Sequence, residues 1–494
     1  MTLPPSKSVD TDRDVAALRL VDQFQRALRR RDRAEIVDRL RQMVALGAPM
    51  AGQWPELARI AADLGEIGLA RAAIDLFVAA FDGNERALAM KVDLLAYIGA
   101  FEEALGLLSS LPHDIPDAFT YALTRGSLTI SAGTTDEARQ WLEEAIRLRP
   151  QSGLAWHLLS VLVDFSNEPD LAARLAGNEG AMQSAPGAER AYYYYALGRA
   201  QDLRGEHARA FAAVASAGSE TKAVFPHDRE LDRRAALDAL NGYDARRIAG
   251  LAREQSEPTG RSIFVMGLPR SGTTLVQQIV TSHSEVSEGA EINLLRLLVH
   301  ETGDASYPAL DAYVRKAGAA PLARLWDHLL GERFPGPGRV VDKTTDTSRK
   351  LGLAAAVLPD APLIWLKRSP LDCAWSCFRT PFMQGIRWSN DLRDIAVNFR
   401  LEDHLLSEWQ RILGERLLVV PFEDLATEPE QWIRAILGHC GLAEEPAAFT
   451  PHENRGRVTT ASVMQVRRPI NRAGIGSAEP YRPYLKPFID GYFN

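Results

Sequence analysis

Cysteine, long apolar runs and excess positive charge are all scarce in this sequence. Its 494 residues include three cysteines, Cys373, Cys377 and Cys440, an odd number too small for a disulfide framework, which fits a reducing compartment. The formal net charge of -7 gives no broad positive field, so no nucleic-acid partner is expected. No apolar run reaches membrane-spanning length, and the first residues, MTLPPSKSVDTDRD, lack the apolar segment of a secretion signal. Together these absences predict a cytoplasmic protein without a membrane span.

No group of Cys and His residues has the spacing of a zinc site, so no bound metal is expected. Cys373 and Cys377 lie four residues apart, which is one helical turn, and this spacing predicts that both pack in the core.

The first half of the chain, residues 15–250, is rich in Ala, Leu, Arg and Glu at helical spacing. Glycines recur there at intervals of 31, 34 and 72 residues, each with an alanine five residues later. The pairs are Gly68 with Ala73, Gly99 with Ala104, Gly133 with Ala138, and Gly205 with Ala210. Tetratricopeptide (TPR) repeats have a period of about 34 residues. This half therefore resembles a TPR helical solenoid, with an irregular helical bundle as the alternative, and residues 1–14 predict a flexible N-terminus.

Residues 251–262, LAREQSEPTGRS, are polar and contain Pro and Gly, which predicts a linker. Over 263–494 short apolar runs alternate with helical patterns; the runs are SIFVMGL, RVVDK, PLIWLKR and RLLVVPFEDL. This alternation predicts an α/β domain with a parallel sheet, so the expected fold class is a helical solenoid followed by a P-loop-type α/β domain. Because the carboxyl ends of parallel strands meet at one edge, Arg270, Lys343 and Arg368 are expected to converge there.

The segment FVMGLPRSGTTLVQQIV predicts a strand, a Gly-rich turn and the start of a helix. Gly267 and Gly272 have the spacing of a phosphate-binding P-loop, but Thr273 stands where the P-loop lysine would be, followed by Thr274. Arg270 lies inside the loop instead. Backbone N–H groups at a helix start bind anions, and the missing lysine disfavours a magnesium-nucleotide kinase or hydrolase. The loop therefore predicts one compact anionic group bound without metal.

The residues PRSGTTL carry a resemblance to the sulfotransferase family, whose loop binds the 5′-phosphosulfate of 3′-phosphoadenosine 5′-phosphosulfate (PAPS). In LKRSPLDCAWSCF, Arg368 and Ser376 are eight residues apart and are similar to the pair that binds the 3′-phosphate in that family. VVPFEDL is similar to a later strand and acidic turn of the same domains. The resemblance covers roughly residues 260–480, and a TPR-like half ahead of it matches the bacterial TPR-containing sulfotransferases. It implies a PAPS-binding loop formed by Pro269, Arg270, Ser271, Gly272, Thr273 and Thr274.

The segment TTASVMQVRRPINRAGIGS is similar to the part of these enzymes that closes over the nucleotide. It implies further contacts to PAPS, or to the product adenosine 3′,5′-bisphosphate (PAP), from Ser462, Gln465, Arg467 and Arg468. Two positions depart from the pattern. Arg468 stands where the tyrosine enzymes have a lysine, and Ala478 where an aromatic residue is usual.

The catalytic domain is most similar to the protein-tyrosine sulfotransferases. Their general base lies about twenty residues after the loop arginine, and in EGAEINLL this place is taken by Glu291, with Ala290 replacing a preceding glutamate. Lys343 in DKTTDTSRK resembles their catalytic lysine. The resemblance implies that Glu291 is the base and that Lys343 and Arg270 stabilise charge on the transferred group. His283 is an alternative base, but its place at the end of the loop helix favours a capping role.

These observations predict a PAPS-dependent sulfotransferase acting on the hydroxyl of a peptide, including tyrosine, of a lipid or of a small molecule. The TPR-like half would recruit the acceptor or a protein partner. The alternative is a TPR scaffold whose nucleotide-binding domain is inactive. The sequence leaves the oligomeric state open, a homodimer included.

Overall fold

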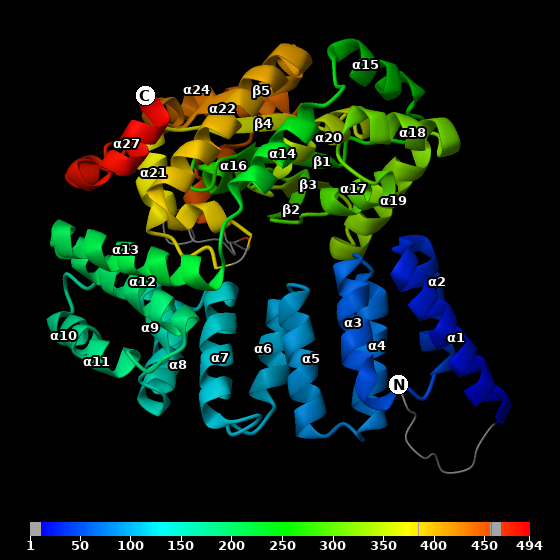
Figure 1. Cartoon of the computed structure of the whole chain (residues 1–494), viewed down its shortest axis with the longest axis horizontal. Coiled ribbons are helices and arrows are strands. Elements are labelled where there is room, and N and C mark those ends of the chain that lie inside the picture. Colours follow the sequence, from blue (N-terminus) through cyan, green and yellow to red (C-terminus); the bar gives the residue numbers. More distant parts are fainter. Residues whose placement is uncertain (1–10, 384, 455, 457–465) are drawn as a thin grey trace. The chain divides into compact units, whose positions relative to one another are not determined.

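The computed structural model describes residues 11–383, 385–454, 456 and 466–494 (Figure 1). The chain divides into two compact units, Met1–Glu144 with Asp327–Pro335, and Ala145–Trp326 with Gly336–Asn494. A single linker at 251–262 was expected. By packing, the chain divides near residue 144, because helices after it share a core with helices beyond residue 370 in the second unit.

The first unit consists of helices that pair with their neighbours along the chain (Figure 1). The helices are α1 (Thr11–Arg30), α2 (Arg33–Leu46), α3 (Trp54–Asp63), α4 (Ile67–Ala80), α5 (Glu85–Tyr97), α6 (Phe101–Ser109), α7 (Ala118–Ala132) and the start of α8 (Thr135–Leu148). Their apolar faces form one continuous core that includes Leu40, Trp54, Leu95 and Tyr121. This arrangement is consistent with the predicted TPR-like region.

The turns inside the successive hairpins repeat more regularly than the sequence pattern indicated. Gly68, predicted as a turn residue, lies inside α4, and the turn is made by Gly65 at φ 80°. Gly99 and Gly133 take the same left-handed conformation, and so does Arg31 at φ 55°. These four residues are each 34 positions apart. The hairpins thus follow the TPR period, and Arg31 occupies a place that elsewhere belongs to glycine.

Each of these turns closes in the same way. The N–H of the residue after the left-handed one donates to the carbonyl five residues back, as Glu66 does to Ala61 and Ala100 to Leu95. This is the hydrogen bond of a Schellman helix end. Five residues after each turn residue a small or apolar side chain is buried: Ile36, Ala70, Ala104 and Ala138. Small residues there let paired helices approach closely.

The second unit opens with further helices: α9 (Gly153–Leu162), α10 (Pro169–Gly177), α11 (Glu179–Met182), α12 (Gly187–Leu203), α13 (His207–Val224), α14 (Arg229–Leu240) and α15 (Ala245–Glu254). α12 and α13 form a hairpin that turns at Gly205, as predicted. Their side chains share a core with the helices beyond residue 370: Tyr195 and Val214 pack in one cluster with Trp375 and Phe378.

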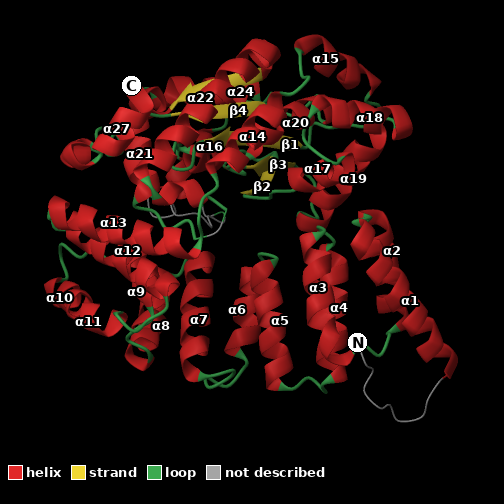
Figure 2. Cartoon of the chain, viewed as in Figure 1, coloured by secondary structure: helices red, strands yellow, loops and turns green. Residues whose placement is uncertain are grey.

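The second unit contains a five-stranded parallel sheet with the strand order β2-β3-β1-β4-β5 (Figure 2). The strands are β1 (Ser262–Gly267), β2 (Val286–Ala290), β3 (Arg339–Asp342), β4 (Leu363–Lys367) and β5 (Leu417–Pro421). The predicted fold class is confirmed, and four of the strands were predicted from their apolar runs. The fifth, β2, is a sheet-edge strand with Val286 as its buried residue, so it offers no comparable run.

Helices cover both faces of the sheet. They are α16 (Thr273–Thr281), α17 (Leu295–Thr302), α18 (Tyr307–Ala317), the start of α19 (Ala320–Arg333), α20 (Leu351–Val357), α21 (Pro370–Phe378), α22 (Leu392–Leu413), α23 (Phe422–Thr427), α24 (Pro429–His439), α25 (Pro446–Phe449) and α27 (Lys486–Phe493). On one face Ile263 and Val265 pack with Ile279 of α16 and Ile433 of α24. On the other, the Phe264 ring lies 5.6 Å from that of Trp326.

The expected linker is short and tied to the sheet unit. α15 ends at Glu254 and β1 begins at Ser262. Between them the Gln255 side chain donates to the carbonyl of Val357, and the Thr259 hydroxyl donates to Asp360 at 2.7 Å. Among the helices of the described residues, none combines the length and apolar character needed to cross a bilayer.

Candidate functional site

The loop between β1 and α16 requires both of its glycines. Gly267 has φ 140° and Gly272, the N-cap of α16, has φ 106°. A Cβ on Gly267 would lie 2.5 Å from the carbonyl oxygen of Leu366, and one on Gly272 would lie 2.6 Å from the Phe422 ring. The loop therefore lies directly against the end of β4 and the residue after β5, which holds the N-terminus of α16 at the carboxyl edge of the sheet.

Arg270 occupies the middle of this loop in a strained conformation. Its φ of 68° is unusual for a residue with a side chain and costs on the order of 1–3 kcal/mol. The Nε group donates to the Ser376 hydroxyl at 3.0 Å. Burial and the charges of Arg379 and Arg368 lower the pKa of Arg270 to about 10, so the guanidinium stays charged at neutral pH. The loop thus holds a cation among other cations.

Arg368, directly after β4, ties the loop to the C-terminal segment. It donates to the carbonyl of Arg270 at 2.8 Å and to that of Gly474, and its guanidinium lies 4.7 Å from the centre of the Phe422 ring. Its Nε is buried and has no hydrogen-bond partner in the described part of the chain. Arg368 therefore joins the loop to the C-terminal segment through two hydrogen bonds, and its Nε–H takes no part in them.

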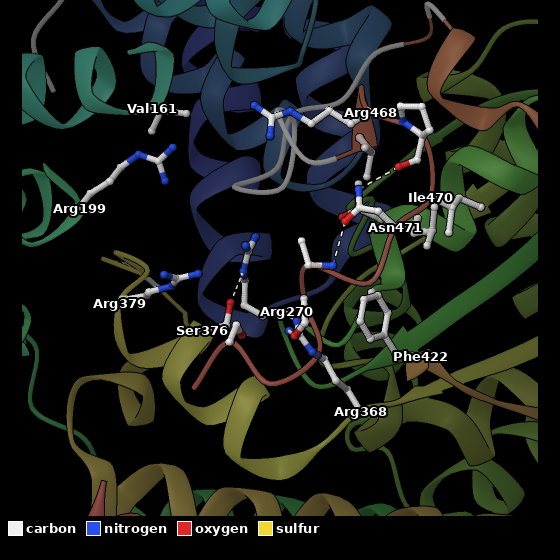
Figure 3. Close-up of a pocket in the computed structure, with 18 of the residues that line it drawn as sticks. Val161, Arg199, Arg270, Arg368, Ser376, Arg379, Phe422, Arg468, Ile470 and Asn471 are labelled. Carbon is white, nitrogen blue, oxygen red and sulfur yellow. Dashed lines mark hydrogen bonds between the residues drawn. The ribbon is translucent and has the colours of Figure 1, made fainter. Parts of the chain in front are cut away.

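A cavity of about 440 Å³ opens beside the loop. Figure 3 shows that the guanidinium groups of Arg199, Arg270 and Arg379 lie near one another on its wall and that Arg468 approaches from the C-terminal segment. Among the described residues, five arginines line the cavity, namely Arg199, Arg270, Arg368, Arg379 and Arg468, together with one carboxylate, Asp164. Such an excess of positive charge suits a ligand with several negative charges.

The cavity brings together six of the predicted cofactor-binding residues: Arg270, Gly272, Thr274, Arg368, Ser376 and Arg468. Pro269, Ser271 and Thr273 belong to the same loop but not to the cavity wall as described. Arg467 donates instead to the backbone carbonyls of Asn454 and Gly456. Ser462 and Gln465 lie outside the described residues.

Sequence reasoning missed three charged residues of the cavity wall. Arg379 lies three residues after Ser376, about one helical turn on, and this spacing was the available signal. Arg199 and Asp164 come from the helices before the sheet, and no sequence pattern connected them with the loop.

Glu291 and Lys343 meet at the ends of two neighbouring strands. Lys343 follows β3, and its backbone N–H donates to the carbonyl of Ala290, the last residue of β2. The Lys343 ammonium is 3% exposed and lies 2.5 Å from a carboxylate oxygen of Glu291, whose side chain is 48% exposed. A buried cation is thus paired with a carboxylate that solvent and solutes can reach. Among the described residues, neither belongs to the wall of the arginine-lined cavity.

Asp342 lies next to this pair and is fully buried. One carboxylate oxygen accepts from the backbone N–H and the hydroxyl of Thr344. Burial raises the pKa of Asp342 to about 6, and the hydrogen bonds from Thr344 oppose this increase.

His283, the alternative base, has a structural role. Its Nδ1 accepts from the N–H of Glu285, and its Nε2 lies 3.1 Å from the carbonyl oxygen of Ala443. Both ring nitrogens are therefore engaged by the backbone, which agrees with the predicted capping role.

Residues 262–446 match the model of the sulfotransferase family. The matched segment of this sulfotransferase-like domain contains the loop, Glu291, Lys343, Arg368 and Ser376. It ends before the C-terminal segment that carries Arg468.

Individual proteins are also similar to the chain. An uncharacterized protein of Aquifex aeolicus is 27% identical over 327 residues; the match covers 62% of this chain and 42% of that protein, so the chain spans less than half of this relative. The sulfotransferase domain of the Synechococcus PCC 7002 olefin synthase is 19% identical, with a TM-score of 0.31, over 46% of this chain and 97% of that one. A sulfotransferase of Mycobacterium tuberculosis H37Rv is 14% identical, with a TM-score of 0.28, over 68% and 98% of the two chains.

Proposed function

We propose that this protein transfers a sulfuryl group from PAPS to an acceptor hydroxyl. The observation that carries this proposal is the arginine-lined cavity beside the loop of the sulfotransferase-like domain, with Arg270 inside the loop and Ser376 bonded to it. A P-loop lysine and a magnesium ligand serve nucleoside triphosphates, whereas fixed guanidinium groups neutralise a phosphosulfate without a metal.

The residues present fit this donor. Gly267 and Gly272 allow the loop backbone to turn closely, so that N–H groups at the start of α16 face an anion. The Ser271 hydroxyl and the Arg368 Nε are buried polar groups that have no hydrogen-bond partner among the described residues. Thr273 and Thr274 begin the helix and add hydroxyl groups. We assign the loop and both threonines to the 5′-phosphosulfate, and Arg368 and Ser376 to the 3′-phosphate.

Glu291 and Lys343 suit the chemical step. PAPS supplies the sulfuryl group, and its bridging oxygen leaves with the adenosine bisphosphate. As the acceptor oxygen bonds to sulfur, its proton must go to a base, and we assign this role to Glu291, whose carboxylate is accessible. Lys343 holds that carboxylate in position, and with Arg270 it is assigned to the charge that develops on the transferred group. The acceptor is a hydroxyl compound, with tyrosine in a peptide as one candidate.

The first experiment separates donor binding from chemistry in the full-length protein. Calorimetric titration without magnesium is expected to show PAP binding at micromolar affinity and far weaker ATP binding. Transfer from radiolabelled PAPS would then be measured with a panel of tyrosine peptides, simple phenols and long-chain alcohols. A protein that is folded and binds no PAP contradicts the proposal.

Replacing the base tests the assignment of the chemical step. Glu291→Gln is expected to leave the affinity for PAP within about twofold and to lower the transfer rate by about 10²–10⁴-fold, the usual contribution of a general base. Glu288→Gln, which changes an exposed carboxylate on β2, the strand just before Glu291, is the matched control and should transfer at the wild-type rate. A wild-type rate in Glu291→Gln would show that another group takes the proton.

A further inference from the structure

Arg199 belongs to helix α12, well before the sulfotransferase-like segment, yet it lines the cavity with the loop arginine. Its Nε donates to the carbonyl of Ser160 at the end of α9, and this hydrogen bond fixes the position of the guanidinium group. Figure 3 shows the guanidinium directed into the cavity, toward Arg379 and Arg270. A helix of the repeat region therefore presents a positioned cation to the candidate site.

Arg379 lies near both Arg199 and Arg270 on this wall. It follows α21, one turn beyond Ser376, and pairs with Asp202 at 2.7 Å. Asp202 also accepts from the Tyr481 hydroxyl, and its one negative charge offsets only part of the positive charge of these arginines. Burial and the charge of Arg379 lower the pKa of Arg199, and Arg379 has the same effect on Arg270. The wall therefore carries repulsion between cations, which Asp202 and Asp164 relieve in part.

Planar guanidinium groups in such a cluster match the oxygens of a phosphate or sulfate ester, which accepts several charge-assisted hydrogen bonds at once. Ser376 adds a hydroxyl from the same helix as Arg379. A monoanion would offset less of this charge than a dianion, and an uncharged ligand none. Among the described residues that line the cavity, Asp164 alone is a carboxylate, and it lies near Arg199 and Arg468.

We propose that Arg199 and Arg379, together with Ser376, bind a phosphate or sulfate ester group, so that helix α12 completes the binding site of the sulfotransferase-like domain. The inference rests on the proposed function for the identity of the ligand. Two sources of this group share the chemistry: the 3′-phosphate of the donor nucleotide, and an anionic ester carried by the acceptor.

Paired ligands and paired variants of the full chain test the proposal. PAP and adenosine 5′-monophosphate, which lacks the 3′-phosphate, are titrated into the wild type, Arg199→Gln and Arg199→Lys. If the group is the 3′-phosphate, Arg199→Gln weakens PAP binding by about 10–100-fold and leaves the monophosphate unchanged, with Arg199→Lys between the two. Arg204→Gln, on the exposed end of the same helix segment, is the matched control and should bind PAP as the wild type does.

A second titration identifies the other source. If PAP affinity is the same in all variants, inorganic sulfate is titrated into the PAP-saturated protein, and binding that is lost in Arg199→Gln assigns the group to the acceptor. Equal PAP and sulfate binding in wild type and Arg199→Gln overturns the proposal. Failure of the proposed function looks different, because PAP would then not bind at all, while inorganic phosphate would still bind to the unliganded wild type and be lost in Arg199→Gln.

Discussion

Two adjacent carbonyl groups hold the loop between β1 and α16 in place. The carbonyl of Pro269 accepts from the thiols of Cys373 and Cys377, at 3.2 and 3.1 Å, and the carbonyl of Arg270 accepts from Arg368. Burial raises the pKa of Cys377, which keeps its thiol protonated and able to donate. The two cysteines are in the core, as their spacing predicted, but they also fix the backbone next to a strained arginine. Loop positioning and core packing are thus served by the same residues.

At Asp342 burial makes stability depend on pH. Its pKa is raised from 3.8 to about 6 in the folded protein, so the folded state holds this proton more tightly than the unfolded chain does. The resulting stabilisation is complete below about pH 4 and is lost as the pH rises through 6. We expect Asp342→Asn, which keeps the oxygen that accepts from Thr344, to remove this loss. Relative to the wild type, its free energy of unfolding should increase by up to roughly 3 kcal/mol between pH 4 and 7.

Urea unfolding followed by tryptophan fluorescence, at half-unit steps from pH 4 to 7.5, measures this difference. Asp490→Asn, on the exposed surface of α27, is the control and should run parallel to the wild type. A constant difference between Asp342→Asn and the wild type over this range would mean that Asp342 does not titrate there.

Among the elements, the hairpins of the first unit show how strongly the turn position favours glycine. Arg31 stands at φ 55°, where Gly65, Gly99 and Gly133 stand in the following hairpins. Arg31→Gly is expected to relieve the strain and to stabilise the unit by about 0.5–1 kcal/mol, because the relief exceeds the entropy that glycine adds to the unfolded chain. Thermal unfolding of the full chain should shift upward by one to a few degrees.

The reverse substitution is the matched control. A Cβ on Gly133 would meet no atom within 4 Å, so Gly133→Ala changes the backbone preference alone. It should destabilise by about 1 kcal/mol. If Arg31→Gly lowered the unfolding temperature instead, contacts of the Arg31 side chain would outweigh its backbone strain.

Elements with strong local patterns were predictable from the sequence, and those defined by tertiary contacts were not. Apolar runs gave four of the five strands, but β2 buries Val286 alone and is defined by its pairing with β3. Likewise the loop, Arg368 and Ser376 follow from short motifs, whereas Arg199 reaches the cavity through the packing of α12 on α21. The turn of the second hairpin was assigned to Gly68 because two glycines lie three residues apart, and only the backbone conformation separates Gly65 from Gly68.

At the scale of the whole molecule, the family match and the packing define different boundaries. The match begins at residue 262, but the core around Trp375 and Phe378 is completed by Tyr195 and Val214, from α12 and α13. A Cβ on Gly218 of α13 would lie 2.7 Å from the carbonyl oxygen of Asn390, so this packing reaches the backbone. These two helices are therefore structural parts of the sulfotransferase-like domain.

This packing predicts how fragments behave. A fragment of residues 255–494 loses α12 and α13, exposes the aromatic cluster of α21, and is expected to aggregate or to unfold without a cooperative transition. A fragment of residues 145–494 keeps the shared core and every described residue of the cavity wall, so it should unfold cooperatively and bind PAP within a few-fold of the full chain. Its unfolding temperature should be lower, because Asp327–Pro335 packs in the first unit and loses its partners there.

Circular dichroism during heating tests whether each fragment unfolds cooperatively, and titration with PAP tests whether it binds the nucleotide. The shorter fragment gives the discriminating result. Its loss of α12 also removes Arg199, so a change in PAP binding could come from lost folding or from the lost arginine. To separate folding from binding, the longer fragment is made with Arg199→Gln. It should keep its cooperative transition while binding PAP or sulfate more weakly, whereas the shorter one loses both properties. A shorter fragment that melted cooperatively would show that the α/β core folds without the repeat helices, and α12 would then be an attached binding element rather than part of the domain.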